Sequence, residues 1–309
     1  MTLDACEILA FACIRDEVLR LPWFLEYHRR AGVNHFFVVD NGSRDGSTDY
    51  LLAQDDVSLF FTKGSYADSE CGLLWVNELL DRFADGHWSL TLDADELLVY
   101  PACELVALRP LTMYLESVGA DALITMLLDM YSDRPIRSTS YAAGRPFLEA
   151  CPFFDSDSYS GLPSDPVPVR GGPRERAFWR DHDWDYPSPF LVKTPLVKWR
   201  RGRVYEASTH QISDIKPAEL SGALLHFKFF GDFPARAVLE SERKEHFAGA
   251  RQYVTYSHVL GGNPDLTLFH DRSVRYLESL QLVHLGLLRM PEHYRTYVES
   301  SHGPIGRID

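Results

Sequence analysis

Short apolar runs of strand length alternate with longer amphipathic segments over the first third of the chain. The apolar runs cover residues 7–14, 35–39, 57–61 and 88–92, and the amphipathic segments cover 21–32, 47–52 and 69–83. Runs that are apolar throughout are typical of strands buried on both faces of a parallel sheet. The alternation therefore predicts βαβ units with right-handed crossovers and a mostly parallel sheet flanked by helices, which is an α/β fold.

The rest of the chain is less regular. A helix is expected over 111–118 and a strand over 122–128, and residues 131–189 then mix Pro, Gly, Ser and Asp with aromatic side chains. Long stretches of this kind often form lids or binding loops. After a basic and apolar stretch at 191–205 come a strand at 223–230 and helices at 235–251 and 273–290. We predict one α/β domain over 1–232 and a helical C-terminal extension over 233–309.

Composition narrows the classes of function. The chain has 309 residues and a formal net charge of −13, which argues against broad binding to nucleic acid or to an anionic membrane. Its five cysteines are scattered without zinc-like spacing, which favours reduced thiols. No signal peptide is visible, and no apolar run approaches the ~20 residues of a membrane span. We expect a cytoplasmic protein, and peripheral association with the inner face of the membrane stays open.

Two polar segments follow predicted strands at the sheet edge where open α/β folds bind ligands. The first is Asp93-Ala94-Asp95-Glu96, whose two Asp residues can share a divalent cation and the phosphates that it carries. The alternative is an acidic turn. The second is the loop 40–49, in which Asp40 can accept hydrogen bonds from a nucleobase or from ribose hydroxyls. The alternative there is an Asx-turn that caps the next helix.

Taken together, these segments resemble a known family. The matching residues are 11–17, 23–28, 32–36, Val39-Asp40-Asn41-Gly42-Ser43-Arg44-Asp45-Gly46-Ser47 and Leu92-Asp93-Ala94-Asp95-Glu96. In this order they resemble family 2 glycosyltransferases, in the branch that shares its Asp-x-Asp-Glu element with family 92. The resemblance implies a GT-A fold, which is the Rossmann-like fold of nucleotide-diphospho-sugar transferases. It also implies a nucleotide-diphosphate sugar as donor, Mn²⁺ or Mg²⁺ as cofactor, and inversion at the anomeric carbon.

The resemblance assigns roles to individual residues. Asp40 lies at the nucleobase or ribose, Asp93 lies at the ribose or the metal, and Asp95 is the direct metal ligand with a catalytic role. The other residues expected around the nucleotide are Cys13, Arg15, Glu17, Asn41, Ser43 and Asp45.

Later positions match the branch less closely. Arg174 belongs to a glycine-containing segment that lines the donor pocket or forms a plain turn, and Lys193 contacts the diphosphate or lies on a solvated strand face. His226, or else His210, is the expected third metal ligand, and the alternative for each is a core position. The general base is chosen from Glu175, Asp181, Asp183 and Glu206, and we select Glu175 because it adjoins the glycine segment.

The sequence therefore predicts a metal-dependent inverting glycosyltransferase that transfers a sugar from a nucleotide-diphosphate donor to a hydroxyl. The expected acceptor is a carbohydrate or lipid-linked molecule of surface polysaccharide or glycolipid synthesis, bound by the loops at 131–189. One alternative is a non-catalytic carbohydrate-binding protein that uses the aromatic residues of those loops. The other is a sugar-nucleotide nucleotidyltransferase, which ranks lower because residues 15–19 contain no glycine.

Overall fold

Eight strands form one sheet in the computed structural model, which describes residues 7–161 and 169–305. The order across the sheet is β3-β2-β1-β4-β8-β6-β9-β5. The bounds are β1 Ile8–Ile14, β2 His35–Asp40, β3 Val57–Phe61, β4 Trp88–Thr91, β5 Glu96–Val99, β6 Ala122–Asp129, β8 Val192–Lys198 and β9 Pro217–His226. Strand β8 runs antiparallel to β4 and β6, and β5 runs antiparallel to β9; the other pairings are parallel. The predicted α/β fold with a mostly parallel sheet is confirmed.

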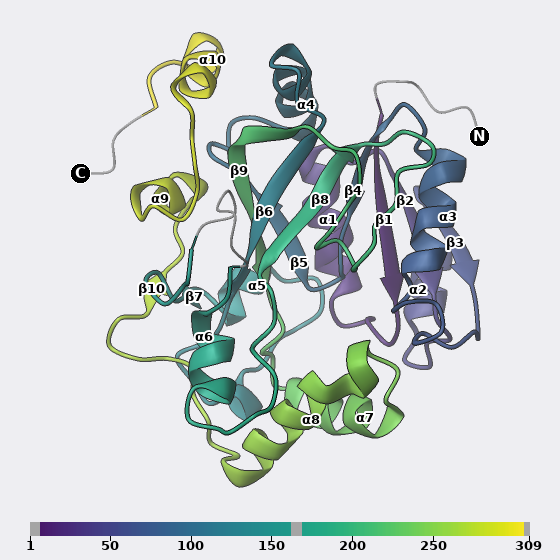
Figure 1. Cartoon of the computed structure of the whole chain (residues 1–309), viewed down its shortest axis with the longest axis vertical. Coiled ribbons are helices and arrows are strands. Elements are labelled where there is room, and N and C mark those ends of the chain that lie inside the picture. The colour runs from purple at the N-terminus through teal and green to yellow at the C-terminus, as the bar shows by residue number, and fades with distance from the viewer. Residues whose placement is uncertain (1–6, 162–168, 306–309) are drawn as a thin grey trace.

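Both faces of the sheet are covered (Figure 1). Alternate residues of β1 point into two different cores: Ile8 and Ala10 pack with helices α1 and α4, whereas Leu9 and Phe11 pack with helix α3. A strand whose two faces are both buried carries apolar residues at every position, which explains the continuous run in the sequence. The helices are α1 Leu21–Ala31, α2 Ser47–Leu52, α3 Leu73–Phe83, α4 Leu108–Ser117, α5 Phe147–Ala150, α6 Gly172–Arg174, α7 Phe233–Arg243, α8 Phe247–Gly262, α9 Ser279–His284 and α10 Glu292–His302.

Helix α1 begins and ends as its sequence indicates. Pro22 lies in the first turn, where its missing N–H costs no hydrogen bond, and the helix ends at Gly32, whose φ of 108° is left-handed. The Gly32 N–H donates to the carbonyls of His28 and Arg29. His28 is fully buried in this helix, which agrees with a packing role for it.

The C-terminal part differs from its prediction in two places. The helix expected over 235–251 is two helices, because Lys244 after α7 and residues 248–250 within α8 adopt left-handed backbone conformations. The helix expected over 273–290 is wrong in its first part, where strand β10 (Val274–Arg275) pairs with β7 (Phe153–Phe154). Only α9 is helical there, and Gly286 follows it with a φ of 73°.

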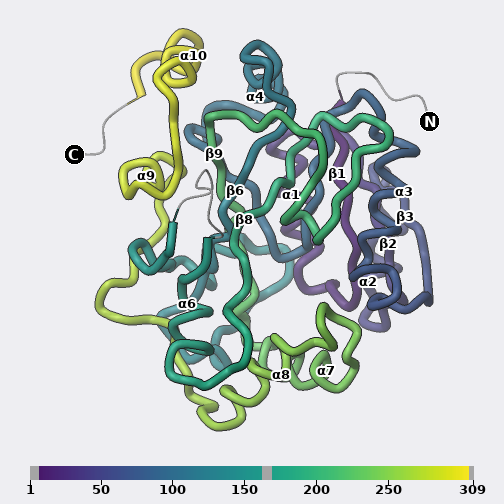
Figure 2. The backbone as a smooth tube through the Cα atoms, in the orientation of Figure 1, coloured from purple at the N-terminus to yellow at the C-terminus, as the bar shows by residue number. Residues whose placement is uncertain are grey.

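One edge of the sheet collects the polar side chains. Strands β2, β4, β6 and β9 are parallel to one another, so the residues at their carboxyl ends lie at the same edge. Strands β5 and β8 run in the opposite direction and begin at that edge. The chain continues from β9 into α7 and α8, which lie beneath the same edge (Figure 2). No helix within residues 7–161 and 169–305 is long and apolar enough to cross a membrane.

Candidate active site

A cleft of about 260 Å³ opens between this sheet edge and helices α7 and α8. Most of the predicted site residues line it, namely Cys13, Arg15, Glu17, Asn41, Asp93, Asp95, Arg174, Lys193, His210 and His226. Asp40, Ser43, Asp45 and Glu175 are not among its lining residues. The carboxyl edge of the sheet therefore brings Asp93, Asp95 and Glu96 together with Asn41 from the loop 40–49 in one cleft, at the edge where open α/β folds bind ligands.

Four side chains of alternating charge lie in a row beside the cleft. Arg174 Nε donates to Asp129 Oδ2 at 2.6 Å, and His226 Nδ1 donates to Asp129 Oδ1 at 2.5 Å. The other ring nitrogen, His226 Nε2, lies 3.3 Å from Asp95 Oδ2. Burial alone raises the pKa of Asp95, but the charge and hydrogen bond of His226 outweigh it and hold this pKa well below its usual range. Asp95 is therefore an ionised carboxylate beside an oriented imidazole.

This arrangement fits a divalent metal. A metal-binding histidine usually donates its second N–H to a carboxylate, which fixes the ring and leaves the other nitrogen for the ion. Asp129 does this for His226. The remaining nitrogen, Nε2, faces Asp95 and carries the proton whose charge lowers the Asp95 pKa, so a metal would bind there in place of that proton. Within the described ranges no group of three or more His, Cys, Asp or Glu side chains could hold a metal ion. Mg²⁺ is commonly bound through one or two carboxylates together with substrate phosphates, so Asp95, with His226 beside it, would form the protein side of such a site.

Asp93 has a different partner. Lys193 Nζ donates to Asp93 Oδ2 at 2.9 Å and to Glu96 Oε1 at 2.5 Å. Burial raises the pKa of Glu96 to about 7, despite the charge of Lys193. Burial lowers the pKa of Lys193, but the two carboxylates outweigh it and keep the ammonium charged. Lys193 thus neutralises the acids next to Asp95, and of the two Asp residues of the motif only Asp95 contacts a histidine.

The second predicted metal-binding histidine lies in the same cleft but is held by the backbone. His210 Nδ1 donates to the carbonyl of Val192 at 2.6 Å. Burial, together with the charge of Lys193, lowers the pKa of His210 to about 4. A neutral imidazole can still bind a metal, but of the two histidines it is His226 that contacts Asp95.

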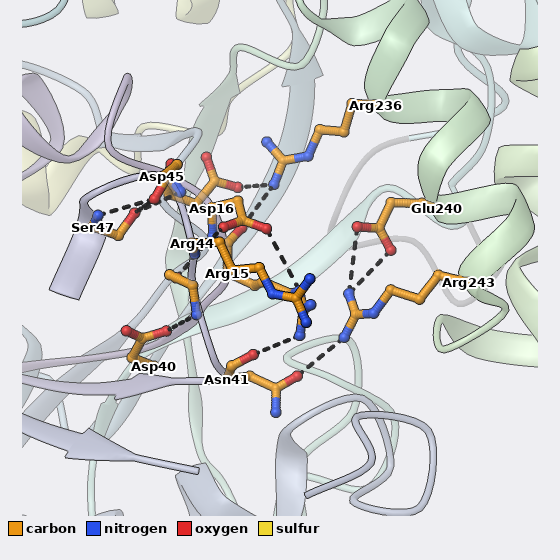
Figure 3. Close-up of polar contacts among 12 residues, drawn as sticks. Arg15, Asp16, Asp40, Asn41, Arg44, Asp45, Ser47, Arg236, Glu240 and Arg243 are labelled. Atoms are coloured by element: carbon orange, nitrogen blue, oxygen red, sulfur yellow. Dashed lines mark hydrogen bonds and ion pairs between the residues drawn. The ribbon is translucent and has the colours of Figure 1, made fainter. Parts of the chain in front are cut away.

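The loop after β2 uses its own side chains to hold its shape (Figure 3). Asp40 accepts hydrogen bonds from the N–H of Ser43 and from the Thr48 hydroxyl, and Asp45 accepts from Ser47 and from the N–H of Val18. These are the contacts of the Asx-turn and cap alternative. They explain why Asp40, Ser43 and Asp45 are absent from the cleft lining, although the loop places Asn41 there.

The loop after β1 is hydrogen-bonded to the loop after β2. The backbone N–H groups of Asp16 and Glu17 donate to the hydroxyl oxygens of Ser43 and Ser47, each at 2.9 Å. The N–H of Val18 donates to Asp45 at 2.9 Å. These three consecutive N–H groups therefore already have acceptors within the protein.

Helices α7 and α8 supply a wall of the cleft that the sequence analysis did not predict. Arg236, Glu240 and Arg243 are spaced four and three residues apart on α7, so they share one helix face, and all three line the cleft. Arg243 lies between Glu240 and Asn41 and donates to Asn41 Oδ1 at 3.1 Å (Figure 3). This spacing is visible in the sequence, but a charged helix face has the same pattern in solvent, so the spacing does not by itself mark the wall of a cleft. The further cleft residues from this region are Lys228, Phe233, His246, Phe247, Ala250, Gln252 and Tyr253.

The cleft is cationic in a strongly acidic protein. Its lining includes seven Lys and Arg side chains (Arg15, Arg20, Arg174, Lys193, Lys228, Arg236 and Arg243) and five Asp and Glu side chains (Glu17, Asp93, Asp95, Glu96 and Glu240). The whole chain carries a formal net charge of −13, so this surplus of cations is local. A local surplus of positive charge favours an anionic ligand such as a phosphate ester.

Glu175, selected from the sequence as the general base, has a different environment. It begins a π-helical segment, Glu175–Trp179, and its Oε2 accepts a hydrogen bond from Ser188 at 2.6 Å. The glycine-containing segment that precedes Glu175 lies mostly outside the cleft. The backbone of Gly171 packs against Ser158 and Tyr159, and of residues 170–175 only Arg174 lines the cleft. A base for this site is therefore better sought among the cleft residues.

Comparisons with known proteins are sparse. No family model matches the chain, and no curated protein matches it. A putative glucose-1-phosphate thymidylyltransferase from Bacillus anthracis is 10% identical, with coverage of 62% of this chain and 69% of that chain and a TM-score of 0.33. A 4-diphosphocytidyl-2C-methyl-D-erythritol synthase is 14% identical over 91% and 98% of the two chains, with a TM-score of 0.29. HddC from Yersinia pseudotuberculosis is 9% identical over 74% of this chain and 80% of that chain, with a TM-score of 0.29. Since these similarities are low, we draw nothing about the reaction from them.

Proposed function

We propose that this protein is a metal-dependent inverting glycosyltransferase that uses a nucleotide-diphosphate sugar and transfers the sugar to a hydroxyl. The observation that carries the proposal is the Asp95–His226 pair, oriented by Asp129, in a cationic cleft at the carboxyl edge of the sheet. The Asp-x-Asp-Glu resemblance and the geometry agree on Asp95. The acceptor expected from the resemblance, a surface polysaccharide or glycolipid, is part of this proposal.

Some residues of the cleft would bind the metal, and others would stabilise the negative charge of the leaving diphosphate. A divalent metal held by Asp95 and His226 would supply Lewis-acid charge to the leaving diphosphate. Lys228 makes no ion pair within the described part of the chain and donates to the Tyr253 hydroxyl at 3.4 Å, so its ammonium has further hydrogens for phosphate oxygens. Burial lowers the pKa of Lys228, but Tyr253 and Asp95 outweigh it, so the side chain stays charged. Fixed cations that need no rearrangement are effective stabilisers of developing negative charge.

Nucleotidyl transfer to a sugar phosphate is the second candidate. The surplus of cations suits a nucleoside triphosphate as well as a diphosphate. The loop after β1 favours the glycosyltransferase. A nucleotidyltransferase is expected to have a glycine-rich loop there, with free N–H groups for phosphates. In this chain the N–H groups of Asp16, Glu17 and Val18 are occupied by the loop after β2.

A thermal-shift screen tests the proposal first. UDP, GDP, CDP and ADP are each added with and without Mn²⁺ to the wild type and to Asp95→Asn. A ligand at about 100 times its Kd stabilises the folded state by about 2.7 kcal/mol, which raises Tm by several degrees. We expect one nucleotide to stabilise the wild type only with Mn²⁺, and Asp95→Asn to lose the metal-dependent part. An equal shift in Asp95→Asn contradicts the proposed metal site.

A product assay separates the candidate reactions. Release of nucleoside diphosphate from a nucleotide sugar supports the glycosyltransferase, whereas release of pyrophosphate from a nucleoside triphosphate and a sugar 1-phosphate supports nucleotidyl transfer. A non-catalytic carbohydrate-binding protein would give neither product. Such a protein would keep its sugar affinity when Asp93 and Asp95 are both replaced by Ala.

A further inference from the structure

His246 and Glu240 form a hydrogen-bonded pair on the α7–α8 wall of the cleft. His246 Nε2 lies 3.1 Å from Glu240 Oε2, and both side chains line the cleft that holds Asp95. Arg243 approaches the same carboxylate, with Nη1 at 3.2 Å from Oε2. Burial raises the pKa of Glu240, but the hydrogen bond and charge of His246 and the charges of Arg243 and Arg236 outweigh it and lower this pKa. Glu240 is therefore an ionised partner for the imidazole.

The pair leaves one nitrogen of His246 available. With Nε2–H donating to Glu240, the lone pair of Nδ1 is free to accept a proton, and Nδ1 makes no hydrogen bond with any other described residue. The side chain of His246 is 28% exposed, whereas that of Glu240 is 9% exposed. A histidine with one nitrogen bonded to a buried carboxylate and the other open to a cleft has the arrangement of a general base.

The ring is also held in place by its surroundings. Its centroid lies 4.5 Å from that of Tyr253 on α8 and 5.3 Å from that of Tyr66 on the loop before α3. The preceding residue, Glu245, accepts hydrogen bonds from the Ser65 hydroxyl and the Ala67 N–H, each at 2.9 Å. The charged and titratable groups that face the ring are thus Glu240 and Arg243 from α7, Tyr253 from α8 and Tyr66 from the loop before α3.

The carboxylates of the cleft are poorer candidates for the base. Glu17 is paired with Arg20 and Arg236, and Asp93 is paired with Lys193. Burial raises the pKa of Glu96 to about 7, but its side chain is only 1% exposed and is held by Lys193, so an acceptor hydroxyl does not reach it. The remaining two, Asp95 and Glu240, each face a histidine. Ion pairing favours the deprotonated carboxylate and so weakens it as a proton acceptor.

We propose that His246 is the general base of the sugar transfer and that Glu240 positions it. In this step the acceptor oxygen forms a bond to the anomeric carbon while the bond from that carbon to the phosphate oxygen breaks. The electron pair leaves with the nucleoside diphosphate, and the acceptor proton passes to Nδ1 of His246. The inference rests on the proposed glycosyltransferase function and adds the residue that acts on the acceptor.

The test compares three histidine or glutamate variants. His246→Gln removes the base, Glu240→Gln removes its carboxylate partner, and His258→Gln is the matched control, because His258 lies on helix α8, which His246 precedes, but not in the cleft. Nucleoside diphosphate release is measured between pH 5 and 9 from UDP-glucose, UDP-N-acetylglucosamine and GDP-mannose, with a panel of simple glycosides as acceptors. The Tm shift given by nucleotide and Mn²⁺ reports folding and donor binding in every variant.

We expect the wild-type rate to rise with pH and then level off. His246→Gln should lose this rise and about 10²-fold to 10⁴-fold in rate while it keeps the nucleotide-dependent Tm shift. Glu240→Gln should move the rise to lower pH, since the imidazolium loses its negative partner. The base assignment is overturned, and the proposed function is not, if the His246→Gln variant is as active as wild type, keeps the pH rise or no longer binds nucleotide. Absence of nucleoside diphosphate release from the wild type overturns the proposed function instead.

Discussion

Asp129→Asn tests whether the buried carboxylate orients His226 for a metal. The side chain of Asp129 is 1% exposed and bonds both His226 and Arg174, so the substitution keeps the shape and removes the charge. Loss of such an orienting carboxylate typically weakens metal binding 10-fold to 100-fold, which is about 1.4–2.7 kcal/mol. Arg174 also loses its buried partner, which costs about 3–5 kcal/mol of folding free energy.

The two effects can be separated with a matched control. Asp155 is equally buried and is bonded by Arg176 at 3.0 Å through both oxygens, but it is absent from the cleft lining. Asp155→Asn should therefore lower Tm to a similar extent and leave the affinity for Mn²⁺ unchanged. Mn²⁺ binding is measured by calorimetry in the presence of the nucleoside diphosphate selected by the thermal-shift screen. If both variants bind Mn²⁺ as the wild type does, or if both lose affinity equally, the orienting role of Asp129 is refuted.

Two further predictions concern stability. Burial lowers the pKa of His28 from 6.5 to about 4, so between these pH values the unfolded chain binds a proton that the folded protein does not. Unfolding free energy should then fall by up to about 3 kcal/mol as pH drops through this window, and His28→Leu should flatten that slope in urea titrations. Gly171→Ala should cost about 3 kcal/mol or more, because its Cβ would lie 2.0 Å from the Ser158 carbonyl oxygen at a φ of 121°. Gly286→Ala, with a left-handed φ but open space, should cost only about 1–2 kcal/mol by the same measurement.

The part of the site on the parallel strands could be predicted from the sequence for a physical reason. A strand buried on both faces has no room for charge, so the first carboxylates after an apolar run mark the carboxyl edge of the sheet. This argument located Asp93 and Asp95, and the same argument applies to Asp129 at the end of β6. Asp129 has no second acid at Asp-x-Asp spacing, so that motif alone does not mark it.

The wall formed by α7 and α8 could not be located in the same way. A helix with charged residues on one face has the same pattern whether that face meets solvent or a polar cleft, so the pattern of α7 does not distinguish the two. A tertiary contact places this face of α7 over the cleft. Arg20 donates to both oxygens of Asp232 at 2.9 and 3.1 Å, and this fixes the start of α7 against the segment before α1.

Pairing within the cleft decides which acidic residue can do which chemistry. Asp93, Asp95 and Glu96 are adjacent in the sequence and are indistinguishable there as candidate ligands. In the fold Lys193 contacts Asp93 and Glu96, and His226 contacts Asp95, so the three carboxylates have different partners. The same reasoning separates Glu240 from the other acids, because its partner His246 is a cleft residue whose side chain is 28% exposed. Partners contributed by β8, β9 and α8 thus assign roles that the residue types alone leave equivalent.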